Sequence, residues 1–310
     1  AEDGIRDKLV TGVQTCALPI SLPSGPMIGR RASRPLVPLL PAGILYLLAF
    51  LVPLAILLAY SVWRLDGFTV VPTFTLDSYA KTLGSPLYQA IFLRTVVVGL
   101  AVAAIVVPIA YALAYAMRFV LGTRGRILLD LVLISMFSGY LVRIYAWRTI
   151  LGKEGILNAA LLQLGVIAEP ITVLVYSNIA TAITLVGMLI PLAVLPVWSS
   201  MANVSRDHLE GAADLGAKGL RLHRTILVPM VLPGLSTAFA IAFILAAGDF
   251  VVPLLVGGTS GLLAGNLVAD QFRGLGADWP LGASIAVVIM VLMLGVTLLV
   301  NRIVRAVTRW

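Results

Sequence analysis

Long apolar runs constrain the fold of this chain more than any other feature of its 310 residues. Six stretches are each long enough to cross the hydrocarbon core of a bilayer, which takes about 20 helical residues. They cover residues 36–63, 90–117, 127–151, 171–201, 230–256 and 281–300. Because 60% of the residues are hydrophobic and only 12% are charged, a soluble domain of this length could not bury so much apolar surface. We therefore expect an all-α integral membrane protein with six transmembrane helices.

The basic residues are distributed unevenly between the two sides of this topology. Most of them flank the ends of runs that face one side, namely Arg30, Arg31, Arg34, Arg118, Arg124, Arg126, Arg206, Lys218, Arg221, Arg224, Arg302, Arg305 and Arg309. The loops of the other side carry only Arg64, Lys81, Lys153 and Arg273. Since cytoplasmic loops carry the excess of Lys and Arg, both termini are expected in the cytoplasm. Membrane topology therefore explains the net charge of +8, and no nucleic-acid partner is expected.

The beginning of the chain differs in character from the rest. Residues 10–20 read VTGVQTCALPI and resemble the translation of a sequencing-library adapter. The single cysteine, Cys16, lies in this stretch and cannot form an internal disulfide. We expect residues 1–26 to be a non-native or disordered segment, with a natural start near Met27, and residues 27–310 to form the transmembrane domain.

The loop between the fourth and fifth runs, about residues 202–229, is rich in small and polar residues. Ser205 or Asp207 can cap a helix, and Gly216 permits a sharp bend after it. The pattern predicts a short helix-turn-helix at the membrane surface. His208 and His223 have no partners at metal-ligand spacing, so both are expected to be plain surface residues and no metal site is expected.

The order Glu-x-Ala-x-x-x-Gly-Ala followed by Ile-x-Val-Pro in this loop resembles the EAA loop of the permease subunits of binding-protein-dependent ABC importers. The resemblance implies a coupling helix that docks into a groove on an ATPase subunit. The residues that would carry the docking are Glu210, Gly211, Ala212, Ala213, Asp214, Gly216, Ala217 and Pro229. Ala212 and Ala213 would permit close approach and Glu210 would make a charged contact. The family usually has Ala at position 211, and Gly211 should loosen the helix by about 1 kcal/mol.

Other stretches resemble the spermidine/putrescine-type branch of this family, and the match runs from about residue 36 to the C-terminus. They include RIYAW at 143–147, GDFVVP at 248–253 and DWPLGA at 278–283. The resemblance implies a type I importer permease in the bacterial inner membrane, with lipid around it and a polyamine as its solute. It also implies a second homologous permease, two ATPase subunits and an external solute-binding protein as partners.

The chain has no Gly-x-x-x-x-Gly-Lys-Ser/Thr motif, so ATP and magnesium are expected on the partner ATPase. No cofactor is expected in this chain, and no catalytic constellation is apparent in it. The chain is therefore expected to be a transport subunit rather than an enzyme.

Asp249 is the acid placed furthest inside an apolar run, where an uncompensated carboxylate costs about 3 kcal/mol. It could line the path of a cationic solute, or it could pair with Arg143 at a similar depth in the third run. Tyr145, Trp147 and Phe250 could line the mouth of this path, where aromatic faces attract alkylammonium groups, or could anchor the chain at the interface.

Three alternatives stay open. The solute could be another small molecule, such as an amino-acid derivative, a phosphonate or an iron complex. The chain could be a secondary transporter driven by an ion gradient, although no internal repeat of the kind such carriers show is apparent. A membrane-embedded scaffold or enzyme is a third alternative.

Overall fold

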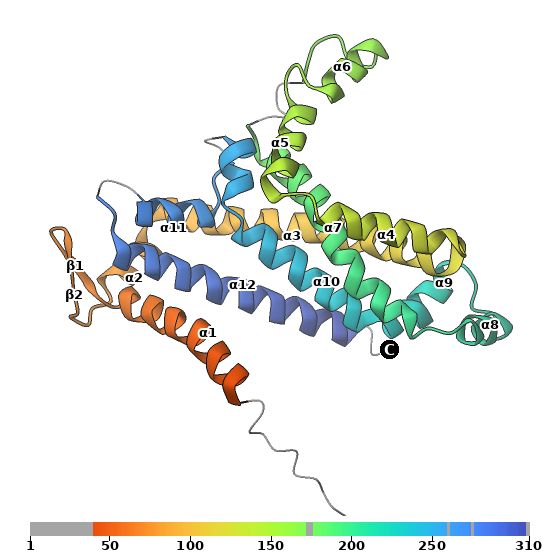
Figure 1. The fold of residues 1–310 in the computed structure, drawn as a ribbon, viewed down its shortest axis with the longest axis horizontal. Coiled ribbons are helices and arrows are strands. Elements are labelled where there is room, and N and C mark those ends of the chain that lie inside the picture. Colours follow the sequence, from red (N-terminus) through yellow and green to blue (C-terminus); the bar gives the residue numbers. More distant parts are fainter. Residues whose placement is uncertain (1–39, 172–175, 259–260, 274–275, 308–310) are drawn as a thin grey trace, which may run out of the picture. The chain divides into compact units, whose positions relative to one another are not determined.

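A computed structural model describes residues 40–171, 176–258, 261–273 and 276–307, and most of these residues are helical (Figure 1). The first part of the chain contains α1 (Leu40–Ser61), β1 (Arg64–Asp66), β2 (Thr69–Val71), α2 (Asp77–Gly84), α3 (Pro86–Tyr115), α4 (Arg124–Met136), α5 (Tyr140–Leu151) and α6 (Ile156–Gln163). The second part contains α7 (Asn178–Ala202), α8 (Arg206–Asp214), α9 (Leu220–Leu222), α10 (Val228–Gly248), α11 (Ala264–Arg273) and α12 (Trp279–Val307). The segment 1–26 lies outside the described residues. The described residues form two units that divide between Leu51 and Val52, inside α1.

The helices confirm the expected membrane fold. Five of them are long and apolar enough to cross a bilayer, over Gly43–Ser61, Pro86–Val120, Asn178–Ala202, Leu220–Gly248 and Trp279–Ala306. A sixth candidate is the pair Arg124–Met136 and Tyr140–Gln163, whose two parts are bent by 101°. The described part of the chain therefore has up to six spans if the bent pair counts as one.

Two of the expected spans are not continuous helices. The third, expected over residues 127–151, breaks between α4 and α5 because Gly139 has extended backbone angles, φ −56° and ψ 141°. The fifth, expected over residues 230–256, breaks after Gly248 because Asp249 is extended, with φ −72° and ψ 134°. In contrast, Pro191 and Pro196 lie inside α7 without ending it.

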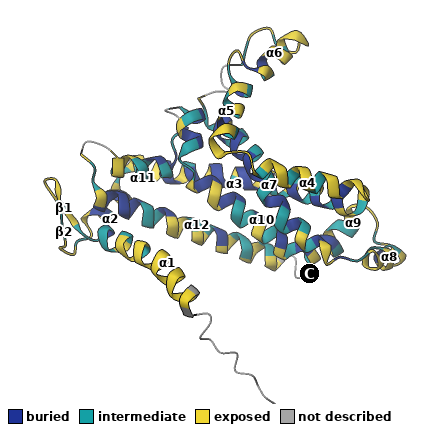
Figure 2. Cartoon of the chain, in the orientation of Figure 1, coloured by how far each residue is buried: buried dark blue, intermediate teal, exposed yellow. Residues whose placement is uncertain are grey.

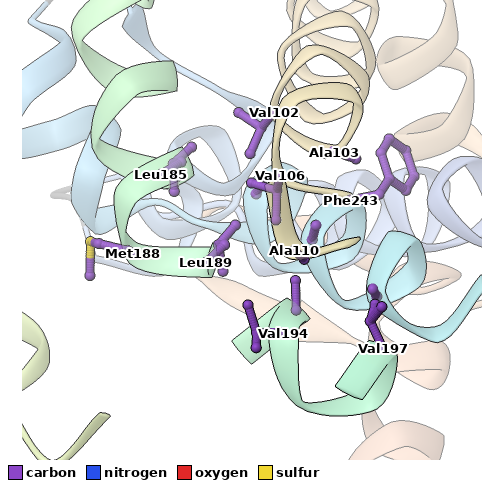
Figure 3. Close-up of a cluster of buried hydrophobic side chains, with 14 of the residues drawn as sticks. Val102, Ala103, Val106, Ala110, Leu185, Met188, Leu189, Val194, Val197 and Phe243 are labelled. Carbon is purple, nitrogen blue, oxygen red and sulfur yellow. The ribbon is translucent and has the colours of Figure 1, made fainter. Parts of the chain in front are cut away.

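The core is formed mainly by α3, α7 and α10 (Figure 3). Fully buried side chains from the three helices meet in it, among them Val102, Val106, Ala110, Val194, Val197 and Phe243. Gly99 lets α10 approach α3 closely, since a Cβ at this position would lie 3.1 Å from the ring of Phe243. At the other end of α10, a Cβ on Gly234 would lie 2.5 Å from the carbonyl oxygen of Pro196 in α7. Close packing of small residues thus holds the three helices together.

A second cluster joins the start of α3 to α11 and α12. Its buried members are Ile91, Phe92, Ala264, Leu281, Ile285 and Ile289. The backbone N–H of Ala264 donates a hydrogen bond of 2.9 Å to the hydroxyl of Thr95, which is fully buried in α3. The short helix α11 is therefore fixed against α3 beside the break in the fifth span.

The helix α1 differs from the others because its side chains are mostly exposed (Figure 2). The most apolar 18-residue stretch of α1 has a mean hydropathy of 2.4, and none of its residues is buried within the chain. A helix with this composition requires lipid or another apolar partner around it.

Candidate functional site

The 202–229 loop begins with a capped helix. The Oγ atom of Ser205 accepts a hydrogen bond from the backbone N–H of His208, and the backbone N–H of Ser205 donates in return to Nδ1 of His208 at 3.2 Å. This reciprocal arrangement is a capping box in which a histidine takes the place of the usual Glu or Gln. His208 is exposed, as expected, but it fixes the start of α8.

The end of α8 is a Schellman motif centred on Gly216. The N–H of Ala217 donates to the carbonyl of Ala212 at 2.9 Å, and the N–H of Gly216 donates to that of Ala213 at 3.0 Å. Gly216 has φ +82°, in the left-handed region that residues with a Cβ rarely adopt. The structure thus places the sharp bend at the residue to which the sequence pattern assigned it.

The face of this loop that points away from the chain consists of Glu210, Gly211, Asp214 and Leu215, all of which are exposed. Leu215 is 89% exposed and is the large apolar side chain next to the bend. Of the two alanines expected to permit close approach by a partner, Ala212 is buried within its own chain and Ala213 is half-buried. Sequence reasoning did not single out Leu215, although it directly precedes the bend.

The second arm of the loop returns to the membrane helices through α9 and a π-helical segment, His223–Leu227. Nδ1 of His223 and the hydroxyl of Tyr111 in α3 are joined by a hydrogen bond of 2.6 Å. The ring of His223 also lies 4.8 Å from that of Tyr115, edge to face. The expectation that His223 is a plain surface residue is therefore wrong, because its ring is packed between the loop and α3. Pro229 lies in the first turn of α10, which follows directly.

The break in the fifth span is held by Asp249. Its Oδ1 atom accepts hydrogen bonds from the backbone N–H groups of Val251 at 2.8 Å and Val252 at 3.1 Å. Its Oδ2 atom accepts a short hydrogen bond from the hydroxyl of Tyr140, the first residue of α5. The carboxylate therefore caps the start of the helical segment that follows Asp249, and its hydrogen bond with Tyr140 connects α5 to the end of α10.

Arg143 does not pair with Asp249. Among the residues that the structure describes, the two side chains form no ion pair, and the buried Nε of Arg143 has no hydrogen-bond partner. The partner of Asp249 is Tyr140 instead, which stands three residues before Arg143 and shares its helix face. The sequence signal that could have identified Tyr140 as a partner of Asp249 is its position three residues before Arg143, on the same face of a helix.

The three side chains of Asp249, Arg143 and Tyr140 line one cavity of about 590 Å³ between α5, α7 and α10. The other lining residues are mostly apolar: Leu185, Met188, Leu189, Leu192, Ile244, Leu245, Gly248, Phe250 and Val251. A mostly apolar wall with a few convergent polar groups is typical of a small-molecule site. A solute in this cavity can therefore contact both the carboxylate of Asp249 and the guanidinium of Arg143.

The remaining predicted pathway residues are placed differently. Phe250 lines this cavity and a second one of about 390 Å³, and the guanidinium of Arg273 lies 5.0 Å from its ring centre. Tyr145 and Trp147 line neither cavity. Tyr145 is exposed, and the indole of Trp147 packs on Gly187 of α7, where a Cβ would lie 2.6 Å from its Cε2 atom. The structure thus brings together Asp249, Arg143 and Phe250 but not the other two.

Within the described ranges of the chain, no group of three or more His, Cys, Asp or Glu side chains is arranged to hold a metal ion.

Comparison with known proteins places this architecture in a family. Residues 88–310 match the family described as binding-protein-dependent transport system inner membrane component. The chain is 34% identical over 258 residues to the spermidine/putrescine transport system permease protein PotB of Escherichia coli strain K12, covering 83% of this chain and 92% of that protein. It is 31% identical over 245 residues to PotB of Haemophilus influenzae, covering 78% of this chain and 84% of that protein.

A solved structure shares the fold. It is the crystal structure of a bacterial ABC transporter involved in the import of the acidic polysaccharide alginate, one chain of which superposes with a TM-score of 0.70 and 15% identity. The superposition covers 88% of this chain and 95% of that chain. The family match over residues 88–310 and the identity to the PotB proteins show that the chain belongs to the family of multi-pass inner-membrane components of binding-protein-dependent transport systems.

Proposed function

We propose that this chain is a permease subunit of an ATP-driven importer and that its solute is a polyamine of the spermidine or putrescine type. The observation that carries the proposal is the similarity to the PotB permeases, which extends over 83% of this chain. A second homologous permease, two ATPase subunits and an external solute-binding protein would complete the transporter, with ATP and magnesium bound by the ATPases.

The electrostatics of the larger cavity support a cationic solute. Asp249 follows the last residue of α10, so its carboxylate adds to the partial negative charge at the C-terminal end of that helix. The hydroxyl of Tyr140 orients the carboxylate, and apolar side chains such as Leu189 surround it. An ammonium group would neutralise Asp249 while the methylene chain of a polyamine lies along the apolar wall.

Arg143 favours a second candidate, because a guanidinium in the same cavity repels a pure cation. A solute that carries both an ammonium group and an acidic group, such as an amino-acid derivative or an aminophosphonate, would satisfy both charges. The second candidate therefore keeps the importer but changes the solute.

The 202–229 loop is proposed to be the docking element for the ATPase, with both termini on the same cytoplasmic side. Leu215, at 89% exposure, would enter an apolar part of the ATPase groove, and Glu210 would meet a basic group at its rim. Gly216 would hold the angle between the docking helix and the arm that returns to α10.

The test compares variants of the cavity in transporters reconstituted with their ATPase, second permease and receptor. Asp249→Asn keeps an oxygen that can accept the two backbone hydrogen bonds but removes the charge, so spermidine uptake should fall at least tenfold. Asp270→Asn is the matched control, because Asp270 is exposed and lines neither cavity, and its uptake should not change. Equal uptake by both variants would contradict the role of Asp249.

Arg143→Gln separates the two candidate solutes. If a polyamine is carried, removal of the positive charge should leave spermidine uptake unchanged or raise it. If the natural solute has an acidic group, the same variant should lose uptake of that solute while ATPase binding to the complex stays intact.

A further inference from the structure

The segment between α1 and α3 carries an apolar surface that the rest of the described chain leaves open. Five large apolar side chains on this segment and on the first turn of α3 are exposed, and we call them the hairpin patch: Phe68, Phe74, Leu76, Leu83 and Leu87. Phe68 is 94% exposed and Phe74 is 78% exposed. Exposed aromatic and leucine side chains gathered in one connecting segment indicate an interaction surface.

Phe68 lies at the tip of the β-hairpin because of the turn that precedes it. The strands pair in antiparallel fashion, with Asp66 opposite Thr69, so only Gly67 and Phe68 connect them. Gly67 has φ +61°, which permits such a two-residue turn. The aromatic ring is thereby held at the end of a hydrogen-bonded hairpin.

The helix α2 buries two hydroxyl residues and exposes a leucine beside charged residues. Its buried residues are Ser78 and Thr82, and the hydroxyl of Thr82 is hydrogen-bonded to that of Ser284 in α12 at 2.8 Å. Leu83, next to Thr82, is exposed. The open face of α2 thus combines Leu83 with the charged residues Asp77 and Lys81, a mixture of apolar and charged groups that suits the headgroup level of a membrane.

The neighbouring features indicate that the hairpin patch contacts lipid. The hairpin begins at Arg64, just after α1 ends at Ser61, and the most apolar 18-residue stretch of α1 has no residue buried in the chain. Tyr60 lies 4.9 Å from Trp63 and 5.9 Å from Trp279, ring centre to ring centre. Clusters of Trp and Tyr are typical of the level where a membrane helix meets the headgroups.

An apolar cavity of about 270 Å³ opens at the same level. It is lined by Pro53, Ile56, Leu57, Tyr60, Phe272 and Trp279. Its lining has no charged group, so it suits the end of an acyl chain rather than a polar ligand. Arg64 and Lys81 are exposed next to the patch, but so are Asp66 and Asp77, and this balance favours no particular headgroup charge.

We infer that the hairpin patch lies in the boundary between headgroups and acyl chains, in the leaflet at which α1 ends, and anchors the hairpin and α2 to the lipid. This inference concerns a lipid contact and does not depend on which solute the transporter carries. The lipid contact would hold the α1–α3 connection at a fixed depth in the membrane, because Phe68 and Phe74 lose apolar contact when the hairpin moves away from the lipid.

The test is spin-label accessibility in the assembled transporter in lipid nanodiscs. Cys16→Ser provides a background to which Phe68→Cys or Phe74→Cys is added and labelled. Lys153→Cys, at an exposed polar position after α5, is the matched control. Labels at positions 68 and 74 should have a severalfold higher ratio of oxygen to nickel-complex accessibility than the label at position 153, because oxygen partitions into lipid and the nickel complex stays in water.

Three results would overturn the inference. A ratio at position 68 equal to that at position 153 would place the hairpin in water. Low accessibility to both reagents would place it in a contact with another subunit. Immobilisation of the label by added receptor would assign the patch to receptor docking. If Phe68→Cys prevents assembly, Phe74→Cys and Leu83→Cys provide the same measurement at the two other parts of the patch.

Discussion

The bend that ends α8 permits a test in which two glycine substitutions should have opposite effects. Gly216 has φ +82° and Gly211 lies inside α8, and a Cβ added to either would have no atom within 4 Å. Any effect of an alanine therefore comes from the backbone and not from a clash. Gly216→Ala forces an alanine into the left-handed region, at a cost of about 1–2 kcal/mol. Gly211→Ala stabilises the helix by about 0.5–1 kcal/mol.

These changes in the folding free energy of the loop change the affinity for the ATPase if the ATPase recognises only the folded loop. A cost of about 1–2 kcal/mol lowers the equilibrium constant for folding of the loop by about 5- to 30-fold, and the affinity for the ATPase falls by up to the same factor. Gly211→Ala should leave the affinity unchanged or raise it, because a helix that is already formed gains little from further stabilisation. The stability of the loop in the wild-type chain should therefore lie between the stabilities in the two variants.

The assay is the equilibrium binding of purified ATPase to the permease complex in nanodiscs, with hydrogen exchange of residues 206–217 measured in parallel. Gly216→Ala should speed the exchange of these amides and weaken binding, whereas Gly211→Ala should slow the exchange. If Gly216→Ala bound the ATPase as tightly as the wild-type chain despite faster exchange, the loop would not be the docking element. If neither variant changed the exchange, the assigned backbone angle of Gly216 would be wrong.

Three further predictions concern packing and polar contacts. Gly187→Ala would overlap the indole of Trp147 and should lower the free energy of unfolding by about 1–3 kcal/mol, whereas Gly295→Ala, inside α12 with no atom near the added Cβ, should leave the Tm unchanged or raise it. Asn158→Ala removes three hydrogen bonds to the backbone from a buried amide and should cost about 1–3 kcal/mol, seen as faster proteolysis of the α5–α6 region with α7 unaffected. Tyr140→Phe should lower spermidine uptake without weakening ATPase binding, and uptake at the wild-type rate would show that the hydroxyl is dispensable.

The sequence predicted the fold class well because length and hydropathy determine it. Apolar runs such as the one over residues 90–117 have no soluble alternative, and α3 forms within Pro86–Val120 as expected. The breaks were not predicted, because an apolar run looks the same whether its helix is straight or bent. Gly139 precedes α5 and Asp249 follows α10, and α5 packs against α7 and the segment Pro253–Gly257, a long-range arrangement that the hydropathy of a run does not encode.

The sequence predicted only part of the candidate site. Asp249 stood out because a carboxylate in an apolar run is costly, and its position identified one wall of the cavity. The partner of this carboxylate could not be read from depth alone, since Arg143 and Tyr140 lie on one helix face and only the orientation of α5 decides between them. Trp147 was assigned to the pathway on its chemistry, but Gly187 offers its indole a packing site on α7 instead.

His223 shows a related limit. A histidine in a basic loop has no sequence feature that distinguishes a surface position from a packed one. Its contact with Tyr111 joins residues 112 positions apart, and it forms because the π-helical segment His223–Leu227 turns the ring toward α3. Local patterns predict caps and bends, such as those at Ser205 and Gly216, but not contacts of this range.

The measurement that tests the central claim most directly is uptake of radiolabelled spermidine into vesicles that contain this chain with the proposed second permease, ATPase and solute-binding protein. The account predicts uptake that requires ATP and the receptor, and that is lost when the ATPase is left out. Spermidine uptake that continues without the ATPase and follows an imposed ion gradient would contradict the account and identify the chain as part of a gradient-driven carrier.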